Sequence, residues 1–353
     1  MKYASFLLAV IVIGCSNNHD YSQLNFDNKM KQISSERFVA GQLVMTDSLN
    51  LEERFGIMNG SSMRADSDYI YINDPFELKI YAIDKKSYAS RELFSPSRGQ
   101  GPREVRGIGN FTVSNRYILI ADERQMKVQV WSKSGEFINE FITDGVRPHR
   151  IVESGESKIT LLSPIPGQSF SLFHTFDMNG NHIQSFGEPE EALRNPLKYS
   201  GGFWSDGQFL YFAGLSEHIL VKFDMDGNHI YSRATIDDYP GEQNYSIQGS
   251  EDNRRFGYVE GGYFSAAGGV IYNNILLIMH VGESPSTSKT QFIDLYKLSD
   301  GSYIGTLEIP RRSGLHNIAV DDNNIYVLTD EDDITYLAVY ENNINELLGG
   351  RIN

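Results

Sequence analysis

Short apolar runs separated by polar turns recur along most of the chain. A typical unit, YILIADERQMKVQVWSKSGEFINEF at residues 117–141, has apolar runs before and after its aromatic residue Trp131. Strands at this spacing, with no long helical pattern between them, predict an all-β fold. Six such units can be recognised, each by one aromatic residue. These residues are Tyr81, Trp131, Phe176, Phe223, Tyr296 and Tyr340.

One unit is nearly copied in the next. FDMNGNHI at residues 176–183 recurs as FDMDGNHI at residues 223–230, 47 positions later (176 to 223), with one residue changed. Each copy has a strand, Asn-Gly or Asp-Gly, and a second strand, which is a strong hairpin signal. A period of about 40–50 residues indicates a propeller or a solenoid.

The units favour a six-bladed β-propeller with four-stranded antiparallel blades. A linear β-solenoid is the competing architecture, although its rungs are usually shorter and do not need these hairpin turns. Residues 38–51 (FVAGQLVMTDSLNL) form an apolar stretch with no partner in the first unit. We expect this N-terminal strand to pair with the last blade and close the ring.

The N-terminus carries the pattern of an export signal. Lys2 precedes an apolar run at residues 6–13, which is too short to span a bilayer and is followed by Gly14 and Cys15. Residues 12–15 (VIGC) resemble the lipobox of bacterial lipoproteins, in which the cysteine is acylated. A buried free cysteine is the alternative for Cys15, the single cysteine of the chain. We expect a signal peptide at 1–14, acylated Cys15 with a flexible tether at 15–36, and the propeller at 37–353.

The charge balance narrows the partners. The net charge is −15 and the sequence contains no block of Lys or Arg, which argues against a nucleic-acid partner. The expected location is the cell envelope, as an outer-membrane lipoprotein, with its periplasmic or surface face left open. The expected partners are the membrane, through the lipid anchor, and a small-molecule, glycan or protein ligand.

Three features together resemble one family. They are the lipobox, the unit at residues 117–141, and RGQGPREV at residues 98–105, which is similar to a G-x-G-P-G-E loop. The chain thus resembles the six-bladed propeller lipoproteins of Bacteroidota-type bacteria, whose repeats are related to NHL and TolB-like propellers. Arg103 stands where that loop usually has its second conserved glycine. The resemblance implies the fold and no single activity.

Candidate binding residues come from the loop and from the inner strands. Residues 98–105 do not fit a phosphate-binding loop, and a crossover between blades explains their glycines, but their arginines could gather an anion. GIGNFTV and GLHNIAV match as inner strands of two units, and a third unit offers His149 and Arg150 at a similar place. The predicted ligand-binding residues are Arg98, Arg103, Asn110, His149, Arg150 and Asn317.

This set suits an uncharged or anionic ligand better than a hard cation, so no metal and no cofactor are expected. The asparagines could equally satisfy backbone groups. The sequence has no G-x-S-x-G or H-E-x-x-H motif. A binding protein is therefore favoured, and a propeller enzyme of lyase or lactonase type, acting at the channel mouth, is the alternative.

Two insertions interrupt the regular spacing. About 25 extra residues, roughly 236–262, are polar and rich in Gly and Tyr, which is long for a connection between blades. We expect them to form an ordered cap. Residues 187–202 predict a short helix that starts near Pro189 and ends at Pro196. Both insertions are expected to overhang the same face.

Overall fold

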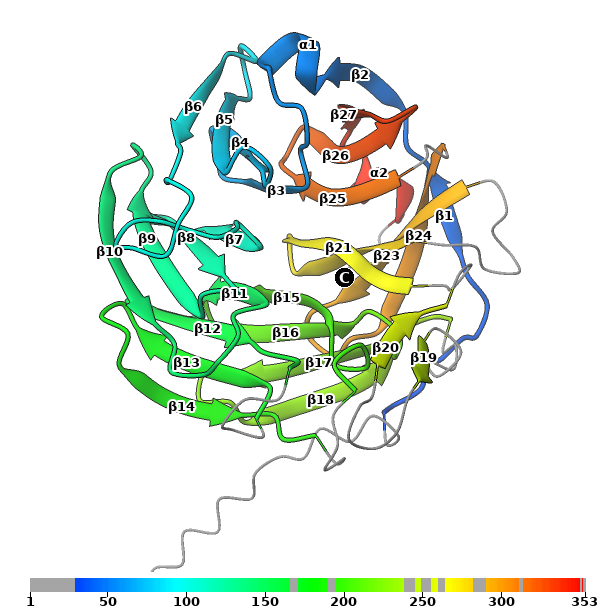
Figure 1. Cartoon of the computed structure of the whole chain (residues 1–353). Coiled ribbons are helices and arrows are strands. Elements are labelled where there is room, and N and C mark those ends of the chain that lie inside the picture. Colours follow the sequence, from blue (N-terminus) through cyan, green and yellow to red (C-terminus); the bar gives the residue numbers. More distant parts are fainter. Residues whose placement is uncertain are drawn as a thin grey trace, which may run out of the picture.

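The chain folds into a ring of six small β-sheets around a central channel (Figure 1). The computed structural model describes residues 29–165, 171–189, 195–237, 245–248, 255–259, 264–281, 290–310, 314–349 and 351. The predicted signal peptide and Cys15 lie outside these residues. Within the described ranges, no helix has the length and apolar character needed to cross a membrane.

Each blade runs outward from an inner strand that lines the channel. The first three blades are β3 (Ser62–Ala65), β4 (Tyr69–Asp74), β5 (Lys79–Asp84) and β6 (Ser90–Phe94); β7 (Asn110–Val113), β8 (Tyr117–Asp122), β9 (Lys127–Ser132) and β10 (Phe137–Ile142); and β11 (Arg150–Glu153), β12 (Lys158–Leu162), β13 (Phe173–Asp177) and β14 (His182–Phe186). The fourth is β15 (Gly201–Ser205), β16 (Phe209–Gly214), β17 (Ile219–Asp224) and β18 (His229–Ala234). The fifth contains β21 (Phe264–Tyr272), β22 (Ile275–Val281), β23 (Thr290–Lys297) and β24 (Tyr303–Pro310), and the sixth contains β25 (Gly314–Val320), β26 (Asn324–Glu331) and β27 (Ile334–Glu341).

The inner strands contact one another in a closed circle, β3, β7, β11, β15, β21, β25 and back to β3. Within each blade consecutive strands pair antiparallel. The predicted six-bladed propeller is confirmed, and the alternative of a linear solenoid is wrong.

The core lies between neighbouring blades, and this explains the repeated aromatic residues. Trp131 of the second blade stacks on Phe94 of the first, with ring centroids 4.4 Å apart. Phe223 of the fourth blade likewise meets Phe186 of the third at 5.3 Å. Burial of one large apolar side chain contributes about 1.5–3 kcal/mol, so these contacts hold each blade to the next.

The repeated Asn-Gly and Asp-Gly turns serve the same junctions. Gly180 and Gly227 have φ of 89° and 80°, which favours glycine. A Cβ atom at Gly180 would lie 2.5 Å from the Cβ of Phe141, so the turn tip rests directly on the outer strand of the preceding blade. The copied motif therefore combines a turn with a contact between blades.

The N-terminal strand closes the ring. β2 (Met45–Asn50) pairs antiparallel with β27 and becomes the outer strand of the sixth blade. One partner was not foreseen, because β1 (Val39–Gln42) pairs parallel with β24 and adds a fifth strand to the fifth blade. The short helix α1 (Leu51–Phe55) follows β2, and α2 (Ile344–Leu347) follows β27.

The sequence predicts a flexible tether at residues 15–36, but the structure holds its described part, from Lys29, against the blades. Met30 forms a parallel bridge with Arg233 on the edge of the fourth blade. Gln32 donates to the carbonyl oxygens of Ala234 and Gly301 at 2.7 and 3.0 Å. Residues 29–50, called the strap below, thus follow the outer edges of blades four, five and six.

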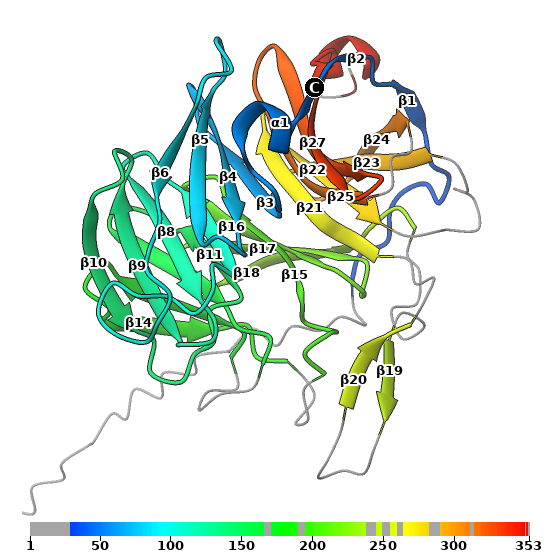
Figure 2. The ribbon, with the colours of Figure 1, turned by 45° about the horizontal axis from the view of Figure 1, so that its top comes forward.

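The large insertion contains a two-stranded hairpin. β19 (Tyr245–Gln248) pairs antiparallel with β20 (Arg255–Tyr258). The hairpin lies beside the fourth blade in Figure 1 and stands away from the ring in Figure 2. The expected cap therefore does not cover the channel with this hairpin. The middle of the predicted short helix, residues 190–194, lies outside the described residues, and residues 196–199 form a turn.

Candidate functional site

All six blades contribute to one polar cavity in the central channel. Its volume is about 170 Å³, and it lies towards the starts of the inner strands. One lining residue from each blade, in blade order, gives Arg64, Asn110, Arg150, Trp204, Gly269 and Asn317. The described residues that line this cavity include no Asp or Glu.

Two arginines give the cavity a positive charge. Arg64 lies on β3, and Arg150 begins β11, two blades further round the ring. Arg64 donates to the carbonyl oxygen of Met63 at 2.8 Å, and Arg150 donates to that of His149 at 3.2 Å. Burial, with a further contribution from the charge of Arg150, lowers the pKa of Arg64 to about 10. The guanidinium of Arg64 therefore remains charged at neutral pH.

Trp204 forms the opposite wall, and two glycines make room for it. Its Nε1 donates to the carbonyl oxygen of Gly269 in the next blade at 2.8 Å. A Cβ atom at Gly202 would lie 1.9 Å from the indole ring, and one at Gly269 would lie 2.6 Å from it. The indole thus lies directly on the backbone of two blades, which it could not do beside any larger residue.

The two asparagines bind backbone groups as well as lining the cavity. The Oδ1 of Asn110 accepts from the backbone N–H of Ile151 in the third blade at 3.4 Å. The Oδ1 of Asn317 accepts from the N–H of Ile318 at 2.9 Å. The sequence analysis left open that these asparagines satisfy backbone groups, and their Oδ1 atoms do so. The Nδ2 groups, which are donors, are what these side chains offer to a ligand.

Three of the six predicted binding residues come together and three do not. Asn110, Arg150 and Asn317 share the cavity. His149 precedes Arg150 in the sequence, but its side chain faces Glu123, with 3.6 Å between its Nδ1 and the carboxylate. Burial lowers the pKa of His149.

Arg98 and Arg103 are not part of the cavity, which corrects that prediction. Arg98 donates to the carbonyl oxygen of Phe76, in the turn between β4 and β5. The guanidinium of Arg103 lies 4.9 Å from the ring of Phe137 on the outer strand β10. The contacts of these two arginines are therefore with the β4–β5 turn and with β10, and not with the inner strands.

The crossover loop between the first and second blades is closed by its own carboxylate. Glu104 accepts from the N–H of Gly101 at 2.7 Å, and a Cβ atom at Gly99 would lie 2.0 Å from the same carboxylate. Glu104 thus fills the space that an anion would need. Arg103 has φ of 64°, so this position takes the left-handed conformation that favours glycine although it carries a long side chain.

Sequence reasoning missed Arg64 and Trp204. The inner strand SMRA that carries Arg64 is short and lacks the Gly, Asn and Val pattern of the other two inner strands. The glycine pair Gly201–Gly202, two positions before Trp204 in the same strand, was a usable signal, because adjacent glycines in a strand mark close approach of another group.

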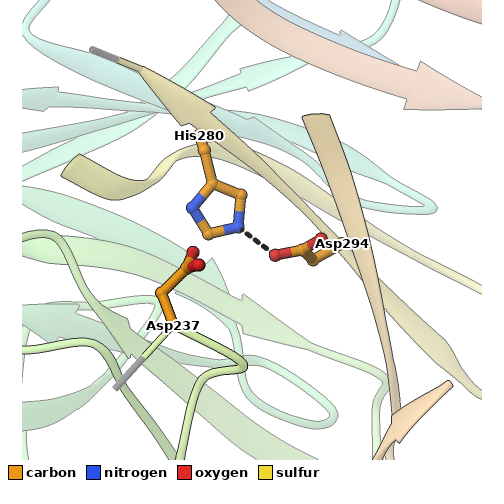
Figure 3. Close-up of side chains that lie close together, drawn as sticks. All are labelled: Asp237, His280 and Asp294. Carbon is orange, nitrogen blue, oxygen red and sulfur yellow. Dashed lines mark ion pairs between the residues drawn. The ribbon is translucent and has the colours of Figure 1, made fainter. Parts of the chain in front are cut away.

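A second group of charged residues lies away from the channel, where the strap meets the fifth blade. Figure 3 shows Asp237, His280 and Asp294 pointing toward one another. His280 Nε2 lies 2.7 Å from Asp294, whose side chain is 0% exposed. Arg37 of the strap donates to Asp237 at 2.8 and 2.7 Å and to Asp294 at 3.3 and 2.8 Å.

This cluster contains its own cation. One ligand atom from each of Asp237, His280 and Asp294 lies within 4.8 Å of the others, which is close enough to hold a metal ion. The guanidinium of Arg37, however, spans both carboxylates. Burial alone would raise the pKa of Asp294, but His280 and Arg37 together hold it well below its usual range. The cluster is therefore an ion-pair network that attaches the strap, and a metal ion would have to displace Arg37.

Comparisons with known proteins identify the fold. No family model and no curated protein matches the chain. A protein named as exported, from Bacteroides fragilis, is 12% identical with TM-score 0.54, covering 88% of this chain and 98% of its own. A DUF4221 family member from Bacteroides vulgatus is 14% identical with TM-score 0.54, covering 85% and 97%. The WD40 repeats of RRP9 are 9% identical with TM-score 0.51, covering 85% and 99%. At these identities, the similarity shows a shared propeller fold and nothing more specific.

Proposed function

We propose that this chain is a lipid-anchored binding protein of the cell envelope, whose propeller channel holds a small polar ligand. The observation that carries the proposal is the cavity to which all six blades contribute, with guanidinium, amide and indole groups in its wall. Concave sites with a few convergent polar groups are typical ligand sites. The export pattern that ends at Cys15 and the exported protein of similar fold support the location.

One observation favours the alternative, a lyase or lactonase type of enzyme. The cavity adjoins a wider part of the channel, about 870 Å³, which shares Arg64 and Trp204 with it and is also lined by Glu153. Burial raises the pKa of Glu153, as a general acid or base would require. A binding protein is still favoured over an enzyme. The described residues that line the narrow cavity supply hydrogen-bond donors, but they include no His, Asp or Glu that could accept a proton.

The two tryptophans of the chain allow a direct test. Trp204 lines the channel, whereas Trp131 is buried against Phe94 between two blades. In a Trp131→Phe protein, emission reports on Trp204 alone. A panel of sugars, amino acids, organic acids and nucleotides should contain compounds that change this emission in a saturable way.

The matched control is Trp204→Phe, whose remaining tryptophan lies in the core and should not respond. An equal response from this control, or no response from any compound class, would refute binding in the channel. Turnover of a bound compound that stops in Glu153→Gln would instead favour the enzyme.

A further inference from the structure

The narrow cavity has the opposite charge to the protein as a whole. The chain carries a net charge of −15, yet Arg64 and Arg150 converge where no described lining residue is acidic. Bringing two like charges together in a partly buried place is unfavourable. Such a pair is maintained against this repulsion in sites that bind a charge of the opposite sign.

Two acidic groups near the arginines, Asp66 and Glu123, have other partners, whereas Glu153, three residues after Arg150, lines the adjoining wider space. Asp66, two residues after Arg64, binds Lys133 and accepts from the hydroxyl of Tyr71 at 2.8 Å. Glu123 offsets part of the positive charge from the side of His149, but it is not in the lining. Among the described residues that line the narrow cavity, the charged side chains are those of Arg64 and Arg150.

We infer that this cavity binds a small oxyanion, a carboxylate, sulfate or phosphate group, between Arg64 and Arg150. The inference rests on the proposed binding function and names its ligand class. A guanidinium presents two parallel N–H groups, which match two oxygens of such an anion. The Nδ2 groups of Asn110 and Asn317 add neutral donors from the second and sixth blades.

The size of the channel indicates the rest of the ligand. The cavity of about 170 Å³ accommodates the anionic group. The adjoining space of about 870 Å³ is also lined by Asp66, Glu153, Glu156 and Asp206, so it accommodates an organic part without a second negative charge. Phe203 and Trp204 line both spaces and supply apolar surface at their junction. The expected ligand is an organic acid or acid ester with one terminal oxyanion.

The experiment titrates the Trp131→Phe protein with sulfate, phosphate and acetate in separate arms, at constant ionic strength set with chloride. Each titration is repeated with Arg64→Gln, Arg150→Gln and Arg91→Gln. Arg91 is an exposed arginine on β6 and serves as the matched control. We expect a saturable change with at least one oxyanion, weakened about tenfold or more by either channel substitution and unchanged by Arg91→Gln.

Failure of the inference can be told apart from failure of the proposed function. Two results would overturn the oxyanion site and leave channel binding intact. In the first, neutral compounds change Trp204 emission and none of the three anions does. In the second, anion binding survives both channel substitutions. No response from any compound would overturn both.

Melting of the unliganded protein gives an independent reading. Arg64→Gln should raise the melting temperature at low salt, and less so at high salt, because it relieves repulsion with Arg150. A lowered melting temperature would show that Arg64 stabilises the fold and would count against a site kept for binding.

Discussion

Replacing Arg37 by alanine should strongly destabilise the protein, because it removes the cation that bridges the carboxylates of Asp237 and Asp294. The side chain of Arg37 is 13% exposed and that of Asp294 is 0% exposed, so water cannot replace the lost contacts at Asp294. Removing one member of a buried ion pair costs about 3–5 kcal/mol. His280 still faces Asp294, which places the expected loss near the lower end, about 3 kcal/mol.

The assay is urea unfolding followed by tryptophan fluorescence at pH 7, with the slope checked for two-state behaviour. Arg37→Lys keeps the charge but cannot span both carboxylates, and we expect it to lose about half as much. Arg351→Ala is the matched control, because this exposed arginine packs on Phe38 of the strap without a carboxylate among its described contacts. It should cost less than about 1 kcal/mol.

The pH dependence has a definite sign. The folded-state pKa values of Asp237 and Asp294 lie below their usual value of 3.8, so their contribution is present above that value and is lost as pH falls through the folded values. The difference between wild type and Arg37→Ala should therefore be constant from pH 7 to about 5 and should narrow below about 4. A loss below about 1 kcal/mol at pH 7, or one no larger than that of Arg351→Ala, would refute the assigned role of Arg37.

Three further predictions test the turns, the ring closure and the anchor. Gly180→Ala should lower the free energy of unfolding by about 2 kcal/mol or more. Gly207 has a similar φ of 87° but no atom within 4 Å of its Cβ, so Gly207→Ala should lower it by about 1 kcal/mol. Equal losses measured by urea unfolding would contradict the contact between blades. Removal of residues 1–28 from a cytoplasmically expressed chain should leave the melting temperature unchanged, whereas removal through Asn50 should lower it sharply by exposing the edge of β27; equal melting temperatures would contradict closure by β2. Cys15→Ser should abolish labelling by a radioactive fatty acid, and labelling that persists would show that the lipobox interpretation is wrong.

The propeller architecture could be predicted because short sequence patterns repeat along the chain. Each unit repeats an aromatic residue, and the clearest units repeat an Asp and a turn glycine, as in Phe223, Asp224 and Gly227. Pairing of β2 with the last blade followed from an apolar stretch that lacked a partner. The parallel pairing of β1 could not be foreseen, because the four residues VAGQ carry no signal for a partner at Thr306–Glu308, so far away in the chain. The free edge of the assembled fifth blade, and not the sequence of β1, determines where β1 pairs.

The site was predicted where an inner strand could be aligned with another, by a sequence match or, for Arg150, by its place in the third unit. Asn110 and Asn317 were found by such a match, and both line the cavity. Arg103 was misplaced because the direction of its loop depends on contacts with Phe137 and with Glu140, which sequence spacing does not reveal. The position of Trp204 depends on Gly269 in another blade, and pairings of that kind appear only in three dimensions.

The pairing of β2 with β27 also determines when the protein can finish folding. Asn50 is opposite Tyr336, so the sixth blade joins segments from the two ends of the chain. Such non-local contacts raise the contact order and slow folding. As the chain is synthesised from its N-terminus, blades one to four can form in sequence while β1 and β2 wait unpaired for strands that are made last. A ribosome that stalls before residue 334 therefore releases an open ring with an exposed strand edge, which suits recognition by chaperones and proteases. Because β2 can close the ring only after β27 has been made, we expect resistance to proteases only once synthesis has passed residue 341.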